Sequence, residues 1–331
     1  RVWNHMRKNR GSISLLHFAA AGSSEPETLR MLTKDFGARS KPKGSLPVWT
    51  PLALAATCGN ACAVAVLLRL HPQKAEVVSD ALRVASATVI GMLVAAGADV
   101  NHVSPSCGTT ALTQASRLSK TDRVVALLAH GADPRVGSKP HAALHQAAKH
   151  GDVKMIQALV AASADVNAKD KDGRAALTMT PPGQRGRQAR LELIALGADV
   201  NARDQDGSTV LHRACMDDDM AVVEAVEAAR TSAVDVEATD QTGCRPIHVA
   251  AAGGHVRIVT ALLALGATVD STDDASGNTA LHYGAFGSHL GVVKELLAHG
   301  AVVNRARSDG VTVLMLAAWN GDDEMLAELL A

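Results

Sequence analysis

Aromatic side chains are scarce in this sequence. Its 331 residues include only three Trp, three Phe and one Tyr, or 2%, although 47% of the residues are hydrophobic. A core without large rings must be built from Ala, Val and Leu, and such side chains suit thin helices that pack closely. The length would accommodate two ordinary domains or one solenoid, since stacked repeats grow without a central core. The scarcity of aromatic residues favours the solenoid.

Net charge, long apolar runs and a cysteine framework are also missing. The 33 Lys and Arg residues balance 33 Asp and Glu residues, whereas nucleic-acid-binding domains usually carry a basic excess. No apolar run approaches the roughly 20 residues of a membrane span, and no secretory signal opens the chain. Five scattered cysteines fit neither a disulfide framework nor a zinc site. We therefore predict an intracellular, cytoplasmic protein that uses no metal or other cofactor and binds no nucleic acid.

One sequence pattern recurs about every 33 residues, which is a solenoid period. In the unit Asn278–Asn304, Thr279 can cap a first helix, and Leu281 and Ala285 share one face of it. A second apolar stripe with helical spacing follows, and Gly300 suits the left-handed residue that ends a helix. The Leu or Ile residues that open the successive first helices are Leu16, Leu52, Leu82, Leu112, Leu144, Leu177, Leu211, Ile247, Leu281 and Leu314.

The repeated motifs resemble those of the ankyrin-repeat family over nearly the whole chain. Variants of T-P-L-H-x-A-A are SLLHFAA from Ser14, HAALHQAA from His141, STVLHRAC from Ser208, RPIHVAA from Arg245 and TALHYGA from Thr279. The turn motif G-A-D-V-N is intact at Gly97–Asn101 and Gly197–Asn201, with near-copies from Ser163 and Gly300. The resemblance implies an all-α solenoid of antiparallel helix pairs with β-hairpin-like loops.

About ten repeats are expected, forming a single ankyrin-repeat domain over residues 1–331. The more regular repeats are about 107–139, 140–169, 204–239, 240–273, 274–306 and 307–331. The degenerate repeats are about 12–47, 48–78, 79–106 and 170–203.

The sixth repeat departs most clearly from the pattern. Pro181 and Pro182 should end its first helix early, because proline clashes inside a helix. We expect a loop at Gly183–Gly186 that carries clustered arginines, which are either solvated or in contact with an anion or an acidic partner. These arginines are Arg185, Arg187 and Arg190. The acidic run Asp217–Asp219 is interpreted as a solvated loop between two helices.

No catalytic motif is present, and we predict that the chain is not an enzyme. The G-x-S-x-G, G-x-G-x-x-G and phosphate-loop patterns are absent. Fourteen histidines could suggest a metal or catalytic site, but five of them occupy one position of the repeat. The resemblance implies a structural role for these five, which are His17, His145, His212, His248 and His282.

The resemblance implies a protein-interaction scaffold or adaptor, most simply a monomer, whose partner the sequence does not identify. Binding would use a concave groove formed by the first helices and the hairpin tips. The candidate residues are Trp49, Lys149, His150, Lys171, Asp172, Arg174, Gln205, Asp206, Met216, Asp217, Phe286, Trp319 and Asn320. Phe286 and Trp319 occupy the same position of successive repeats. They could anchor a partner in the groove, or they could cover the last repeats.

Two alternatives remain open. The chain begins with Arg1 rather than Met, so we expect a fragment or a processed product. It could be the substrate-recruiting part of a kinase, a ubiquitin ligase or a membrane protein such as a channel. Four turn asparagines also resemble the targets of an asparaginyl hydroxylase, although they could simply satisfy the turn backbone. They are Asn101, Asn167, Asn201 and Asn304.

Overall fold

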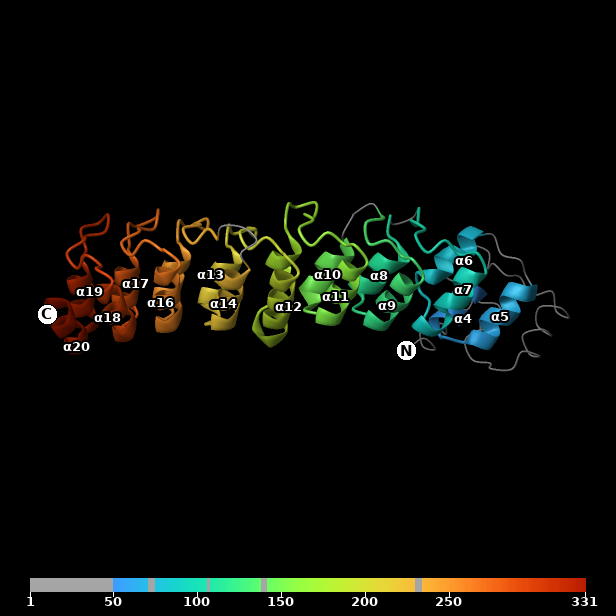
Figure 1. Ribbon diagram of the computed structural model, residues 1–331, viewed down its shortest axis with the longest axis horizontal. Coiled ribbons are helices and arrows are strands. Elements are labelled where there is room, and N and C mark those ends of the chain that lie inside the picture. Colours follow the sequence, from blue (N-terminus) through green and yellow to red (C-terminus); the bar gives the residue numbers. More distant parts are fainter. Residues whose placement is uncertain (1–49, 71–74, 106–107, 138–141, 230–233) are drawn as a thin grey trace, which may run out of the picture. The chain divides into compact units, whose positions relative to one another are not determined.

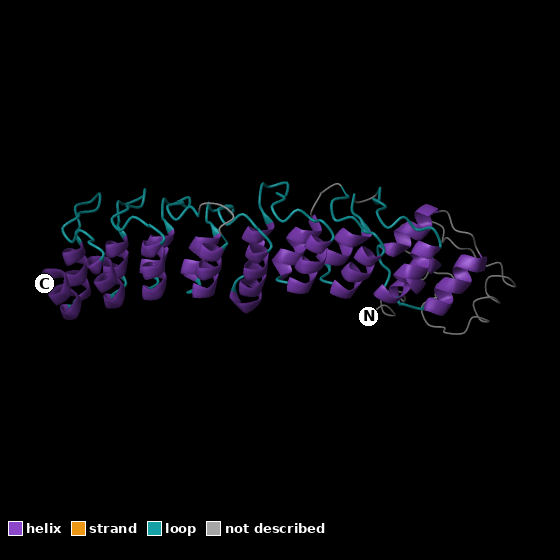
Figure 2. Cartoon of the chain, in the orientation of Figure 1, coloured by secondary structure: helices purple, strands orange, loops and turns teal. Residues whose placement is uncertain are grey.

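The computed structural model describes residues 50–70, 75–105, 108–137, 142–229 and 234–331. Within these ranges the regular structure is entirely helical (Figure 2), and the predicted all-α repeat architecture is confirmed. The loops carry isolated antiparallel bridges instead of strands, at Lys169–Ala175, Thr272–Thr279 and Ala306–Thr312. The predicted first repeat and Trp49 lie outside the described residues, so the total of ten repeats stays a prediction.

Two compact units make up the described chain. The first unit contains the described residues up to Ala147 together with Gln157–Asp165, and the second contains Ala148–Ile156 and Val166–Ala331. The helices of the first unit are α4 (Pro51–Thr57), α5 (Ala61–Leu70), α6 (Ala75–Leu82), the 3-10 helix η1 (Ala87–Val89), α7 (Ile90–Ala95), α8 (Ala111–Arg117) and α9 (Thr121–Ala129). Helix α6 begins ahead of the predicted start of the third repeat at residue 79.

Helices α10 (Ala142–His150) and α11 (Val153–Ala161) contribute residues to both units. The second unit continues with the 3-10 helix η2 (Ala176–Met179), α12 (Gly183–Ala195), α13 (Val210–Met216), α14 (Met220–Ala228), α15 (Pro246–Ala252), α16 (Val256–Ala264), α17 (Ala280–Phe286), α18 (Leu290–Ala298), α19 (Val313–Asn320) and α20 (Asp323–Leu330). The single-domain organisation of residues 1–331 stays a prediction.

Helix pairs of the second unit stack in sequence order. The first helices α13, α15, α17 and α19 pack one against the next, and the second helices α14, α16, α18 and α20 do the same. Figure 1 shows this succession, with the long connecting loops gathered at one end of the helices. Leu211, Ile247 and Leu281 are at most 1% exposed, and each contributes about 1.5–3 kcal/mol by leaving water.

Buried histidines begin the first helices of three successive repeats, which confirms their predicted structural role. In α13 and α17, the Nδ1 atoms of His212 and His282 each accept the backbone N–H of the capping Thr. In α15, Nδ1 of His248 accepts the N–H of Arg245 at 3.1 Å, and Nε2 lies 2.8 Å from the carbonyl oxygen of Ser271 in the hairpin loop. Each ring therefore closes the start of a helix, and His248 also ties its helix to a loop.

The sixth repeat confirms one prediction and corrects another. Its first helix is only the 3-10 helix η2, because Pro181 and Pro182 follow one residue after its end. The expected loop at Gly183–Gly186 is wrong, since α12 begins at Gly183. Pro182 has an extended conformation (φ −66°, ψ 164°) that leads into the helix. A Cβ atom at Gly186 would lie 1.6 Å from the carbonyl oxygen of Pro181, so glycine lets the first turn of α12 pack against the prolines.

Candidate interaction surface

Large apolar side chains are exposed at the ends of the first helices in the second unit. Met216, Phe286 and Trp319 are 68%, 70% and 90% exposed, although apolar residues of this size are usually buried. Ala252 is also exposed and holds the same repeat position in α15, as does Lys149 in α10. We call these five residues the exposed row. Because Phe286 and Trp319 are so exposed, the alternative that they cover the last repeats is wrong.

The exposed row owes its position to the helix period. Four of the five row residues directly follow a buried small residue, for example Cys215 before Met216 and Ala285 before Phe286, whereas Trp319 follows the exposed Ala318. The buried residue packs towards the neighbouring first helices, so the next residue turns by about 100° onto the free side. Periodicity alone predicts this placement, and the structure adds the extent of exposure.

Polar contacts between repeats hold the row in place. The Asn320 amide donates to the carbonyl oxygens of Ala285 and Phe286, both at 3.1 Å. Nε2 of His289 lies 3.0 Å from the carbonyl oxygen of Ala252 in the preceding repeat. Asn320 was a candidate binding residue, and the structure shows that its side chain joins the ninth and tenth repeats.

Aspartates shape the hairpin tips. Asp204 accepts the N–H groups of Asp206 and Ser208, and Asp170 accepts those of Asp172 and Arg174. Asp273 makes the same kind of turn and also accepts the hydroxyl of Tyr283 at 2.7 Å. Burial raises the pKa of Asp273, but these hydrogen bonds outweigh burial and lower its pKa to about 2. The tips are therefore held by charge-assisted hydrogen bonds.

The candidate residues at the tips differ in how their side chains are engaged. Arg174 pairs with Asp170 and Asp172, both at 2.7 Å, and Lys171 pairs with Asp172 at 3.2 Å. Gln205 and Asp206 are exposed, and their carbonyl oxygens accept N–H groups of Gln241 in the next repeat. At the tip of the sixth repeat, the charged side chains thus pair with one another.

Asp217 and the neighbouring acidic run are engaged inside the molecule. Nη2 of Arg190 lies 2.9 Å from the Asp217 carboxylate, and Nε of Arg187 lies 2.9 Å from that of Asp219. Arg190 and Asp219 are each only 1% exposed. The prediction of a solvated Asp217–Asp219 loop is therefore wrong for Asp219. Arg187 and Arg190 bind these internal carboxylates, which leaves Arg185 as the exposed arginine of the cluster.

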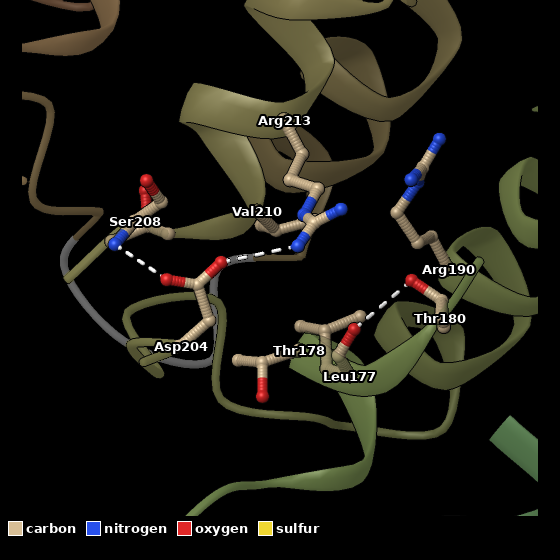
Figure 3. Close-up of a pocket in the computed structure, with 9 residues that line it drawn as sticks. Leu177, Thr178, Thr180, Arg190, Asp204, Ser208, Val210 and Arg213 are labelled. Atoms are coloured by element: carbon tan, nitrogen blue, oxygen red, sulfur yellow. Dashed lines mark hydrogen bonds and ion pairs between the residues drawn. The ribbon is translucent and has the colours of Figure 1, made fainter. Parts of the chain in front are cut away.

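A small pocket lies beside Arg190 where the shortened first helix of repeat six meets α13 (Figure 3). Asp204 receives bonds there from the Ser208 N–H and from Arg213, while Thr180 donates to the Leu177 carbonyl. Its free space of about 10 Å³ is near the lower limit for a single water molecule. The pocket therefore has no room for a small-molecule substrate.

Three of the four turn asparagines bridge repeats. Asn101 donates from Nδ2 to the carbonyl oxygen of Gly131 and accepts the N–H of Asp133 on Oδ1. Asn167 makes the same two contacts with Gly197 and Asp199, and Asn201 accepts the N–H of Asp235. Asn304 is exposed. These contacts agree with a structural role in the turns, and hydroxylation of any of the four stays a prediction.

Lys149 and His150 end α10, with Lys149 exposed and His150 half-buried. The motifs identified Lys149 by its position in the repeat. Arg185 was identified only as one of three clustered arginines, and its position beside the end of α10 was not predicted, because it follows from the packing of α12. A Cβ atom at Gly151, just after α10, would lie 3.1 Å from the Cβ of Arg185. Glycine at position 151 is a sequence signal for this close approach.

The repeated helix pairs, the capped first helices and the hairpin turns define a helical repeat protein of the solenoid class. A family model described as ankyrin repeats (3 copies) matches residues 81–170, 185–273 and 265–331. The chain belongs to the ankyrin-repeat family. Among the residues that the structure describes, no helix is long and apolar enough to cross a membrane, and no three His, Cys, Asp or Glu side chains group as a metal site.

Proposed function

We propose that this chain is a scaffold or adaptor that binds partner proteins through the exposed row and the hairpin tips of the second unit. Ankyrin repeats are in general protein–protein interaction modules. The observation that carries the proposal is the exposure of Met216, Phe286 and Trp319 at one repeat position. Large apolar and aromatic residues of this kind dominate binding energies when they are buried in an interface.

Two features favour binding without rearrangement. The row lies at the ends of stacked helices, and Asn320 and His289 fix the backbone beneath it. A surface already in its binding conformation loses less entropy on association. We further propose that the protein acts in the cytoplasm as a monomer, without catalytic activity or cofactor.

The test combines Phe286→Ala and Trp319→Ala in one variant. Proteins captured from a native lysate by the unmodified chain are identified, purified and titrated against both forms. We expect the double variant to lose at least about 1–2 kcal/mol of binding free energy per ring, with an unchanged melting temperature. Val125→Ala, which truncates an exposed residue in α9 of the first unit, is the matched control. A fall in melting temperature with unchanged partner affinity would contradict the proposal.

A further inference from the structure

The acidic and the basic side chains beside the exposed row differ in whether they have partners within the chain. Five carboxylates lie in the loops between first and second helices of the second unit, and each has an internal partner. Asp152, Asp219 and Asp322 cap the second helices that follow them. Asp217 pairs with Arg190, and Asp218 lies 3.4 Å from Nδ1 of His255. Each carboxylate of these loops therefore already has a partner within the chain.

The cationic side chains at one end of the row have no such partners. Lys149 ends α10 and Arg185 lies in the first turn of α12, and both are exposed. Neither side chain has an ion-pair or hydrogen-bond partner in the part of the chain that the structure describes. The close approach at Gly151 places the backbone of Arg185 directly beside the end of α10. Two exposed cationic residues therefore belong to backbone segments that meet at the fifth and sixth repeats.

The opposite end of the row is apolar and aromatic. Phe286 and Trp319 come from the neighbouring first helices α17 and α19, which pack against each other. The residues that follow them, Gly287 and Asn320, carry no charge. The row thus changes from cationic at repeats five and six to aromatic at repeats nine and ten, with Met216 between.

From this polarity we infer that the partner segment carries an acidic cluster joined to bulky apolar side chains. The inference rests on the proposed function of the row. The carboxylates would lie against Lys149 and Arg185, and the apolar side chains would contact Phe286 and Trp319. Packed helices are about 8–10 Å apart, and an extended chain advances about 3.3 Å per residue. Three repeat junctions separate Arg185 from Phe286, so about nine residues would join the two parts of the segment.

Synthetic peptides test this inference. Each fluorescent peptide carries one apolar Leu/Phe block and one block of Glu, Lys or Gln, joined by about nine Gly/Ser residues. Both block orders are made, and binding is measured by anisotropy at low and at physiological salt. We expect the Glu peptide in one order to bind at least about tenfold tighter than the Lys peptide. This preference should weaken as salt screens the charges.

Two variants assign the effect to the two ends of the row. Lys149→Glu/Arg185→Glu should abolish or reverse the preference for the Glu peptide, and Phe286→Ala/Trp319→Ala should weaken all the peptides. The matched control is Arg257→Glu/Arg305→Glu, which makes the same charge change at exposed positions outside the row. Circular dichroism and melting temperatures confirm that each variant is folded.

The inference is wrong if no peptide binds or if the Lys peptide binds as tightly as the Glu peptide. It is also wrong if Lys149→Glu/Arg185→Glu and the control variant change peptide binding to the same extent. A natural partner separates this failure from that of the proposed function. If its affinity depends on Phe286 and Trp319 but is unchanged by Lys149→Glu/Arg185→Glu, the row is an interaction surface and only the acidic chemistry is wrong. If neither variant changes its affinity, the proposed function is wrong as well.

Discussion

His248 joins the start of a helix to a loop, and its contact at the helix start depends on the protonation state of its ring. Its Nδ1 atom accepts the N–H of Arg245, so this nitrogen must be unprotonated. Burial lowers the pKa of His248 from its ordinary 6.5, and the charge of Arg245 lowers it further, although the bond to Ser271 opposes them. Burial likewise lowers the pKa values of His212 and His282. Folding therefore favours the neutral form of all three rings.

We predict that the free energy of unfolding decreases as the pH falls below about 6.5, because the unfolded state then binds more protons than the folded state. The contribution of these rings is fully present above this pH. Urea unfolding at about pH 7.5 and 5.5 measures the change and avoids the range in which most carboxylates titrate. His248→Gln should be less stable at pH 7.5 and show a smaller decrease on acidification. An equal decrease in both proteins would contradict a role for this ring.

Gly186 is a second residue whose role depends on one contact. Its backbone φ is not positive, so alanine is disfavoured only by the backbone of Pro181. We predict that Gly186→Ala destabilises the protein by about 1–3 kcal/mol, because helix α12 must move to accommodate the methyl group. Gln188→Ala, at an exposed position of the same helix, should have no effect or a slight stabilising one. Chemical unfolding of both variants gives the comparison, and equal stabilities would show that the contact relaxes freely.

At the scale of elements, helix α12 supplies contacts to the next repeat that the short helix η2 cannot make. Arg190 extends from α12 to the acidic loop before α14, and the charges of Arg190 and Asp219 are almost completely buried. Replacing one member of a buried ionic group leaves the others without compensation. The ionic group thus makes the junction between repeats six and seven depend on specific side chains rather than on apolar area alone.

We predict that Arg190→Ala lowers the free energy of unfolding by about 3–5 kcal/mol. Asp217→Asn should have a smaller effect, because Asp217 is partly exposed and the new asparagine side chain can still accept a hydrogen bond from Arg190. Hydrogen exchange should locate the loss of protection in α12 and in the start of α14. A change of less than about 1 kcal/mol for Arg190→Ala would show that the buried group contributes no net stability.

At the scale of the whole molecule, each repeat of the second unit contacts its neighbours in sequence. Stability in such an array is approximately a sum of the stabilities of the repeats and of the interfaces between neighbours. We predict that Leu211→Ala in α13 costs about 2–5 kcal/mol. The loss of hydrogen-exchange protection should be largest in α13 and in adjoining α12, α14 and α15, and smallest in α19 and α20. Equal loss across the second unit would indicate all-or-none unfolding instead.

The sequence by itself determined the repeat period, the helix pairs, the capping residues and the position of the exposed row. These features follow from patterns within one repeat, where helix geometry alone decides which residues share a face. The tertiary structure decided how Asp217, Asp219, Arg190 and Asn320 are used, and it placed Arg185 beside the end of α10. Each of these contacts joins different repeats. Local periodicity carries no information about such pairs, because their distances depend on how one repeat packs on the next.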